Sequence, residues 1–491
     1  MKNVRVRIAP SPTGYPHIGT IYQAMFDFVF AKKYGGKFIV RIEDTDRNRF
    51  VEKAEEIIFN SLDWFGLKSD ENPKIGGPYA PYRQSERLDI YKKYAFELVE
   101  KGHAYYCFCT KERLEKMRGD QETKKLPPMY DKTCLNLNKD QVEENLKNNI
   151  PYVIRMKVPE NRKVVVLDTL AGEIGFNSSQ IDHQVILKSD GFPTYHLAVV
   201  VDDYLMKVTH VFRGKEWLPS TPKHILLYEF LGWEDSIPTF IHLPVILNAD
   251  GKGKLSKRLK TASVDYYKNM GFLPEAILNY LANIVWNHPE GKEIYPLMDL
   301  GLAFHEDPFR VDVTSSGPRF DLTKLEWMNG EYLRKMDDES LSKRLMEFLG
   351  SKYEGEVVKK LVPLTKERIK KFADFIPLTS FIFEEPKYDM EVLNKVKIES
   401  PKEILEEVIK TLDSLGKPWK VDAFEKTFRQ LAEKLEIKVG DFFQLFRFAI
   451  SGKLVTPPLF ESIQILGEKE TIDRIKKLVV ISNRIGGETN G

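Results

Sequence analysis

The sequence predicts an α/β protein in which a parallel sheet is split by an α+β insertion and followed by all-helical domains. Strand and helix patterns alternate over residues 1–90 and again over 196–245, which is typical of a doubly wound sheet. The intervening residues 91–195 lack this alternation. After about residue 330, Leu, Phe and Ile recur at helical spacing beside many Lys–Glu neighbours.

The first ninety residues contain the clearest individual elements. Val4, Val6 and Ile8 share one face of a predicted strand, and an amphipathic helix follows it. The sequence then predicts a second short strand at Lys37–Arg41 and a second helix at Val51–Phe65.

Length, charge and cysteine content limit the function classes. A chain of 491 residues suits roughly three to five domains. It has no apolar run near the roughly 18–20 residues that cross a bilayer, so we expect a cytoplasmic protein with no membrane partner. Three cysteines rule out a disulfide scaffold. Because the net charge is only +2, a nucleic acid would have to be bound by local basic patches.

The loop after the first strand, with the sequence PSPTGYPHIGT over 10–20, is the most informative stretch. It brings His17 to the start of the next helix, where backbone N–H groups and the helix dipole attract an anion. An imidazole can also donate to a phosphate. A lone histidine at this place is more often a structural cap, so the interpretation depends on a second motif.

That second motif is the sequence KGKLSKR over 252–258. A basic run of this kind is usually a solvated loop. A glycine among lysines, with a serine able to anchor the loop, also suits a mobile clamp on a polyanion. The two motifs resemble the HIGH and KMSKS motifs of class I aminoacyl-tRNA synthetases, in the same order and at a similar separation.

Charged residues at predicted strand ends indicate an amino acid as ligand. Glu43 ends the second strand and is assigned to a substrate amine, while Asp44 or Asp46 suits a helix cap. Arg7 ends the first strand, and Arg213 follows a buried strand. Two arginines converging on one pocket favour glutamate, which has a second carboxylate, over glutamine.

Together with residues 320–330 and 451–460, these segments resemble the bacterial glutamyl-tRNA synthetases over nearly the whole chain. The resemblance implies that Arg7, Tyr195 and Arg213 bind the glutamate side chain or carboxylate, and that Ser11 and Glu43 bind its polar groups. The ATP-binding residues it implies, of which the histidine and the two lysines are catalytic, are His17, Gly19, Glu216, Leu247, Lys254, Ser256 and Lys257.

The chain departs from the family pattern at two positions near these motifs. Tyr22 stands where an arginine is common, so no role is assigned to it, and Lys215 stands where an acidic residue or alanine is usual. The domains implied by the resemblance are a Rossmann-type catalytic domain (1–90 and 196–245), an inserted acceptor-binding domain (91–195), a helical stem-contact domain with the KMSKS-like loop (246–330), and helical anticodon-binding domains (331–380 and 381–491).

The reaction implied by the resemblance is ligation of L-glutamate to tRNA(Glu) with ATP and Mg²⁺, through a glutamyl-adenylate. tRNA would have to bind before glutamate is activated. Whether tRNA(Gln) is charged as well stays open, and we expect a monomer. One rival is glutaminyl-tRNA synthetase, whose C-terminal half is a β-barrel. The others are a truncated tRNA-modifying relative without the C-terminal helices and a non-catalytic tRNA-binding protein on the same scaffold.

The three cysteines lie close together in the sequence, within the predicted insertion. The family sometimes binds zinc there through a pattern that ends in Cys-x-His, but the last position here is Asn136. A related truncated synthetase has a Tyr-x-x-x-Cys variant. The resemblance therefore implies a structural Zn²⁺ held by three thiolates and a phenolate, or an empty remnant of such a site. The four ligands would be Cys107, Cys109, Tyr130 and Cys134.

The helices after residue 330 hold one basic run, Lys366–Lys371. Such a run is usually a solvated helix face. The resemblance places it in the anticodon-binding region, so we expect Lys370 to contact phosphate and Arg368, the only arginine in the run, to read a base.

Overall fold

The computed structural model describes residues 3–46, 49, 51–256, 259–305, 311–416 and 419–488, with side chains up to residue 482. It divides into two compact units. Unit 1 comprises Met1–Tyr267 and Ile277–Leu322, and unit 2 comprises Lys268–Ala276 and Thr323–Gly491. The expected segment 246–330 is therefore shared between the units. No described helix is long and apolar enough to cross a membrane.

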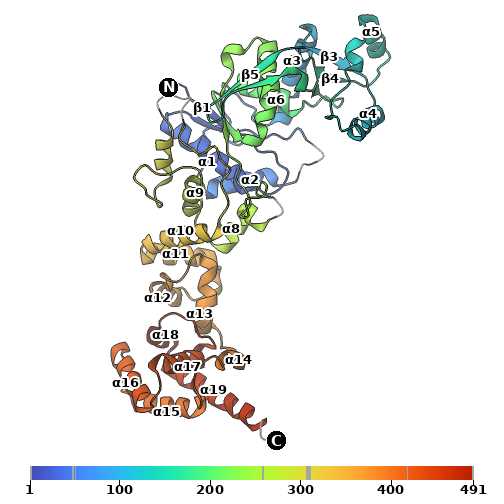
Figure 1. Cartoon of the computed structure of the whole chain (residues 1–491). Coiled ribbons are helices and arrows are strands. Elements are labelled where there is room, and N and C mark those ends of the chain that lie inside the picture. Colours follow the sequence, from blue (N-terminus) through green and yellow to red (C-terminus); the bar gives the residue numbers. More distant parts are fainter. Residues whose placement is uncertain are drawn as a thin grey trace. The chain divides into compact units, whose positions relative to one another are not determined.

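The centre of unit 1 is a set of mostly parallel strands (Figure 1). The first two strands pair in parallel, and four others form a sheet in the order β6-β5-β9-β8. Thr209 donates its backbone N–H to the Arg5 carbonyl at 2.9 Å, which joins the two groups into the order β2-β1-β8-β9-β5-β6. The strands are β1 (Arg5–Ile8), β2 (Lys37–Val40), β5 (Lys163–Asp168), β6 (Gly172–Asn177), β8 (His210–Gly214) and β9 (Thr239–Leu243).

Helices of unit 1 supply much of the apolar core around these strands. In α6, all eight residues from His196 to Asp203 are buried. Its two aspartates must therefore find charged partners inside the protein. The main helices are α1 (Ile18–Lys33), α2 (Ala54–Trp64), α3 (Leu88–Glu100), α6 (Tyr195–Leu205) and α7 (Thr221–Leu231), followed by α8 (Val264–Met270) and α9 (Pro274–Asn283), which cross the unit boundary.

The segment 91–195 contains an antiparallel sheet of its own in the order β3-β4-β7. It also contributes to the main sheet, because β5 pairs in parallel with β9 through Asp168 and Phe240. The insertion is thus not a separate block in space. Its further elements are β3 (Ala104–Cys107), α4 (Lys111–Thr123), α5 (Lys139–Lys147), β4 (Val153–Met156) and β7 (Val185–Leu187).

Unit 2 is helical throughout its described part, as the spacing of apolar residues predicted (Figure 1). In α16, Phe424, Phe428 and Leu431 recur every three or four residues and are all buried. Two apolar clusters form its core. Its helices are α10 (Leu322–Lys335), α11 (Asp338–Leu349), α12 (Gly355–Thr365), α13 (Phe375–Phe383), α14 (Met390–Leu393), α15 (Pro401–Ser414), α16 (Val421–Lys434), α17 (Val439–Ser451), α18 (Leu459–Leu466) and α19 (Glu468–Glu488).

Candidate active site

The predicted first motif forms the loop between β1 and α1, and His17 is the N-cap of α1. Its Nδ1 accepts the backbone N–H of Gly19 at 2.9 Å, and its Nε2 lies 3.1 Å from the Leu255 carbonyl. Because a carbonyl only accepts, the ring carries its proton on Nε2. A Cβ at Gly19 would lie 2.9 Å from His17 Nδ1, so glycine is needed for the ring to cover the helix end.

The second motif lies beside the first, with its Leu255 bonded to His17. Lys254 forms an ion pair with Glu216, and its backbone pairs with Leu247 in an antiparallel bridge. Lys257, the other predicted catalytic lysine, lies outside the described residues. The described part of the motif is therefore connected both to the histidine loop and to the segment after β8.

Both motifs line one cavity of about 740 Å³. Five of the seven residues expected to bind ATP are in its wall, namely His17, Gly19, Glu216, Lys254 and Ser256. Leu247 is not in this wall. Its N–H and C=O are bonded to Pro318 and Phe320, and Ile246 lines the cavity instead.

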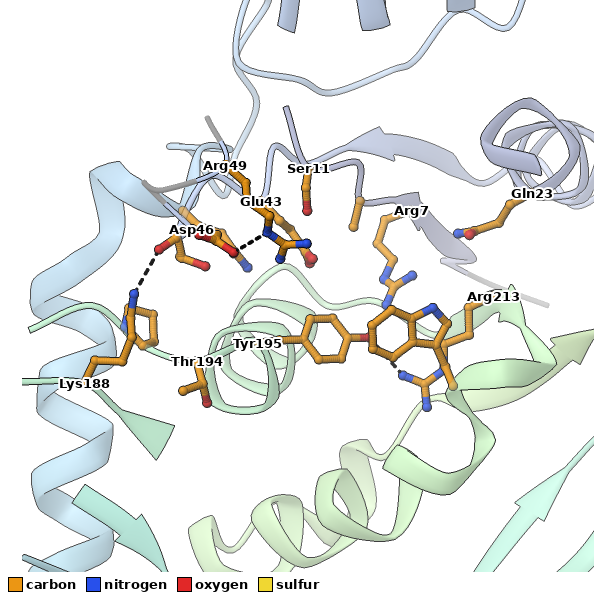
Figure 2. Close-up of a pocket in the computed structure, with 15 residues that line it drawn as sticks. Arg7, Ser11, Gln23, Glu43, Asp46, Arg49, Lys188, Thr194, Tyr195 and Arg213 are labelled. Atoms are coloured by element: carbon orange, nitrogen blue, oxygen red, sulfur yellow. Dashed lines mark hydrogen bonds and ion pairs between the residues drawn. The ribbon is translucent and has the colours of Figure 1, made fainter. Parts of the chain in front are cut away.

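A second cavity of about 470 Å³ adjoins the first and contains all five residues expected to bind glutamate. Arg7 and Arg213 come from β1 and β8, and the Tyr195 side chain extends from α6 toward them (Figure 2). Arg213 donates to the Tyr195 hydroxyl at 3.2 Å. The cavities share five lining residues, Ala9, Ser11, Gln23, Arg49 and Trp217, and are therefore continuous.

The second cavity is backed by a buried ion network. Asp203 of α6 binds Arg7 through two hydrogen bonds of 3.1 and 3.2 Å, and it also accepts from Arg41 at 2.6 Å. Burial raises the pKa of Asp203, but the two arginines outweigh this effect and lower it overall. Asp202, the preceding residue of α6, forms an ion pair with Arg87, in which Arg87 Nε lies 2.8 Å from Asp202 Oδ1.

Glu43 completes the network at the cavity wall. Arg41 donates to its Oε1 at 3.1 Å, and burial raises the pKa of Glu43 against the opposing effect of Arg41. The carboxylate expected to bind the substrate amine is therefore already held by one arginine. Sequence reasoning missed Arg41, Asp202 and Asp203 as parts of the site.

The four predicted metal ligands also come together. The sulfur atoms of the three cysteines lie within 4.8 Å of one another. The Tyr130 hydroxyl lies 3.4 Å from Cys107 Sγ and 3.2 Å from Cys109 Sγ. Thiolates about 2.3 Å from a tetrahedral zinc are compatible with such spacing, so the donor set fits one ion.

The expected anticodon residues lie in unit 2, but the basic run is not part of a helix. α12 ends at Thr365, and the run that follows forms a turn. At the end of this turn, the Asp374 carboxylate accepts the backbone N–H groups of Lys370 (2.9 Å) and Lys371 (3.0 Å). Arg368 and Lys370 are exposed.

A further arginine, missed in the sequence, lies near this turn. Burial lowers the pKa of Arg447 in α17, and the charge of Arg368 lowers it further. Arg447 donates to the Thr456 hydroxyl at 3.0 Å. The positive charges of Arg447 and Arg368 therefore lie close enough to interact. No sequence motif surrounds Arg447, so only its position in the fold reveals it.

Comparison with known proteins identifies the class. The family model described as the catalytic domain of class I tRNA synthetases (E and Q) matches residues 3–327, and an anticodon binding domain model matches residues 340–479. The chain belongs to this family of class I tRNA synthetases.

Individual relatives match nearly the full length. The chain is 44% identical to the glutamate–tRNA ligase of Cellvibrio japonicus, covering 99% of this chain and 95% of that one. It is 43% identical to the enzyme of the same name from Acinetobacter baumannii, covering 97% and 94%. The crystal structure of a glutamate tRNA ligase from Elizabethkingia meningosepticum in complex with its amino acid matches with a TM-score of 0.84 and 35% identity, covering 97% of this chain and 99% of that chain.

Proposed function

We propose that this chain ligates L-glutamate to tRNA(Glu) at the expense of ATP. The observation that carries the proposal is the positive end of the second cavity. Arg7, Arg213 and the Tyr195 hydroxyl meet there, and the acceptors of Arg213 are uncharged. The side-chain carboxylate of glutamate fits this environment better than an amide, because it supplies the negative counter-charge that the buried guanidinium of Arg213 lacks.

The mechanism follows from how the two cavities join. Glutamate in the smaller cavity presents its α-carboxylate to ATP in the larger one, with Glu43 near its amine. The carboxylate attacks the α-phosphate, giving glutamyl-adenylate and pyrophosphate. The terminal ribose hydroxyl of tRNA then attacks the acyl carbon, and AMP leaves. No protein nucleophile is required, since positioning and charge stabilisation suffice.

Individual residues have distinct roles in this scheme. His17 and Gly19 form the helix end that faces the triphosphate, and Lys254 with Lys257 stabilises the charge that develops on pyrophosphate. Mg²⁺ bound with ATP neutralises part of the phosphate charge. We place the enzyme in the cytoplasm, where its substrates occur together.

Two finer assignments belong to the same proposal. Cys107, Cys109, Cys134 and Tyr130 hold one structural Zn²⁺, which is supported by the spacing of the three sulfurs. Arg368 and Lys370 contact the anticodon region of tRNA, which is supported by their exposure within the part of the chain matched by the anticodon-domain model.

Aminoacylation with purified tRNAs tests the function directly. The wild-type enzyme should charge tRNA(Glu) with glutamate and should not use glutamine. Parallel reactions with tRNA(Gln) show whether this tRNA is a second substrate. Charging with glutamine in preference to glutamate would overturn the proposal.

A further inference from the structure

Arg213 differs from the other buried arginines of the site in the kind of acceptor it uses. Its Nε donates to His242 Nε2 at 2.9 Å, and its two terminal nitrogens donate to Thr221 (2.7 Å), Tyr195 (3.2 Å) and His224 (3.3 Å). In the described part of the chain no carboxylate forms an ion pair with it. Arg7 and Arg41, by contrast, both bind Asp203 directly.

The hydrogen bond from Arg213 fixes the protonation of His242. A guanidinium only donates, so His242 Nε2 must offer its lone pair and the ring proton lies on Nδ1. Nδ1 then donates to Asp168 Oδ2 at 2.6 Å. The same carboxylate accepts the backbone N–H groups of His242 (3.0 Å), Leu170 (3.0 Å) and Ala171 (2.7 Å), which hold it in place.

The hydrogen bonds from Arg213 to His242 and from His242 to Asp168 form a relay that spans three adjacent strands. Arg213 of β8 and His242 of β9 are register partners, and Asp168 at the end of β5 pairs with the other side of β9. The side chains of His242 and Asp168 are fully buried. Bulk water therefore has no access to the hydrogen bond between them, and the sheet sets its geometry.

We propose that Asp168 and His242 are positioning residues that aim Arg213 at the side-chain carboxylate of the amino acid substrate and leave its charge for that carboxylate. The inference rests on the proposed glutamate specificity. A carboxylate bonded directly to the guanidinium would compete with the substrate for it. A neutral imidazole orients the guanidinium without neutralising it, and Asp168 stabilises the buried cation from one residue further away.

Two substitutions of His242 separate the two hydrogen bonds of its ring. His242→Gln keeps an acceptor near the Nε2 position and loses the link to Asp168, whereas His242→Asn keeps a group near the Nδ1 position and loses the acceptor for Arg213. We expect His242→Asn to raise KM for glutamate about tenfold, with KM for ATP changed less than about twofold. The rise for His242→Gln should be smaller.

The matched control is His210→Gln. His210 is a buried histidine at the opposite end of β8 from Arg213, and it lies 2.8 Å from the Thr209 hydroxyl. This variant should leave both KM values near those of the wild type. The inference is overturned if His242→Asn leaves KM for glutamate unchanged, or if it raises the KM values for glutamate and ATP equally, as a general structural defect would.

A spectroscopic measurement tests the relay without depending on glutamate charging. In protein labelled with ¹⁵N-histidine, the signals lost in His242→Gln identify His242. They should show a neutral ring with its proton on Nδ1, and that proton should move upfield in Asp168→Asn. A proton on Nε2, or no shift in Asp168→Asn, overturns the inference. Failure of the wild type to charge glutamate would instead refute the proposed function and leave this measurement valid.

Discussion

His17 and Leu255 connect the two nucleotide motifs directly, because the imidazole Nε2 donates to the Leu255 carbonyl at 3.1 Å. The other nitrogen of the same ring accepts the Gly19 N–H and caps α1. One side chain thus supports both the helix start and the described part of the second motif.

Substitution of His17 can separate these two contacts. In His17→Asn the side-chain oxygen still caps α1, but the bond to Leu255 is lost. We expect tRNA-dependent pyrophosphate exchange to fall on the order of 10²-fold, because the second motif is less well positioned. Because the cap is retained, thermal unfolding of His17→Asn should show a smaller loss of stability than that of His17→Ala. We expect the free energy of unfolding of His17→Ala to be about 1 kcal/mol lower than that of His17→Asn. Full exchange activity in His17→Asn would contradict this account.

Lys254→Ala should slow activation on the order of 10²–10³-fold, with little change in KM for glutamate, because the lysine acts on developing phosphate charge. Pyrophosphate exchange measured against each substrate separates the two effects. Lys252→Ala, an exposed lysine of the same segment, is the matched control and should retain activity. The same loss is expected for Lys257→Ala. A variant with normal maximal rate and weaker ATP binding alone would refute the role of Lys254.

Arg213→Gln should impair glutamate use selectively. Removing one partner of a buried charge pair costs on the order of 2–5 kcal/mol, so KM for glutamate should rise by at least about thirtyfold. Discrimination against glutamine should fall as well. Aminoacylation with each amino acid measures both quantities. If the ratio between the two amino acids were unchanged, Arg213 would not contact the substrate side chain.

Metal analysis tests the cysteine cluster. Purified protein should contain about one zinc per chain, and Cys109→Ser should lose it. Asn136→Ala is the control: Asn136 lies two residues after Cys134, its amide is a poor zinc ligand, and the variant should keep the metal. A folded, fully active preparation without metal would identify the cluster as a remnant.

The turn after α12 permits a paired test of tRNA binding. Lys370→Ala should weaken the binding of all tRNAs alike. The slope of the logarithm of the binding constant against the logarithm of the salt concentration should become shallower by about one, as expected for the loss of one phosphate contact. Arg368→Ala should instead change the preference among tRNAs that differ at the anticodon. Arg447→Gln should change the preference among these tRNAs in the same direction as Arg368→Ala. Exchange at saturating tRNA should survive all three changes. If both arginine variants kept the anticodon preference of the wild type, other residues would recognise the anticodon bases.

Much of the fold was predictable because its signals are local. The alternation of Val4, Val6 and Ile8 identified β1, and the helical spacing after residue 330 identified unit 2. The convergence of Arg7 and Arg213 could also be predicted, because parallel strands bring their carboxyl ends to one edge. The expectation that the basic run lies on a helix was wrong, since the run forms a turn after Thr365. The end of that turn is bonded to Asp374, a side chain that lies beyond the run in the sequence.

The counter-ions of the site could not be predicted in this way. Asp202 and Asp203 end an apolar run that indicates only a buried helix. Which arginines they meet depends on how α6 packs against β1, the segment after β2, and the segment before α3. The role of His242 was hidden for a similar reason, since it depends on the register of three strands and not on neighbouring residues.

The shared carboxylate of Asp203 has a consequence for synthesis of the chain on the ribosome. It lies 196 residues after Arg7 and 162 residues after Arg41 in the sequence. Both arginines are therefore translated long before their common counter-ion. The insertion, residues 91–195, is translated after the arginines and before Asp203. The amino acid pocket cannot acquire its final charge balance until α6 has left the exit tunnel, however early β1 and β2 have paired.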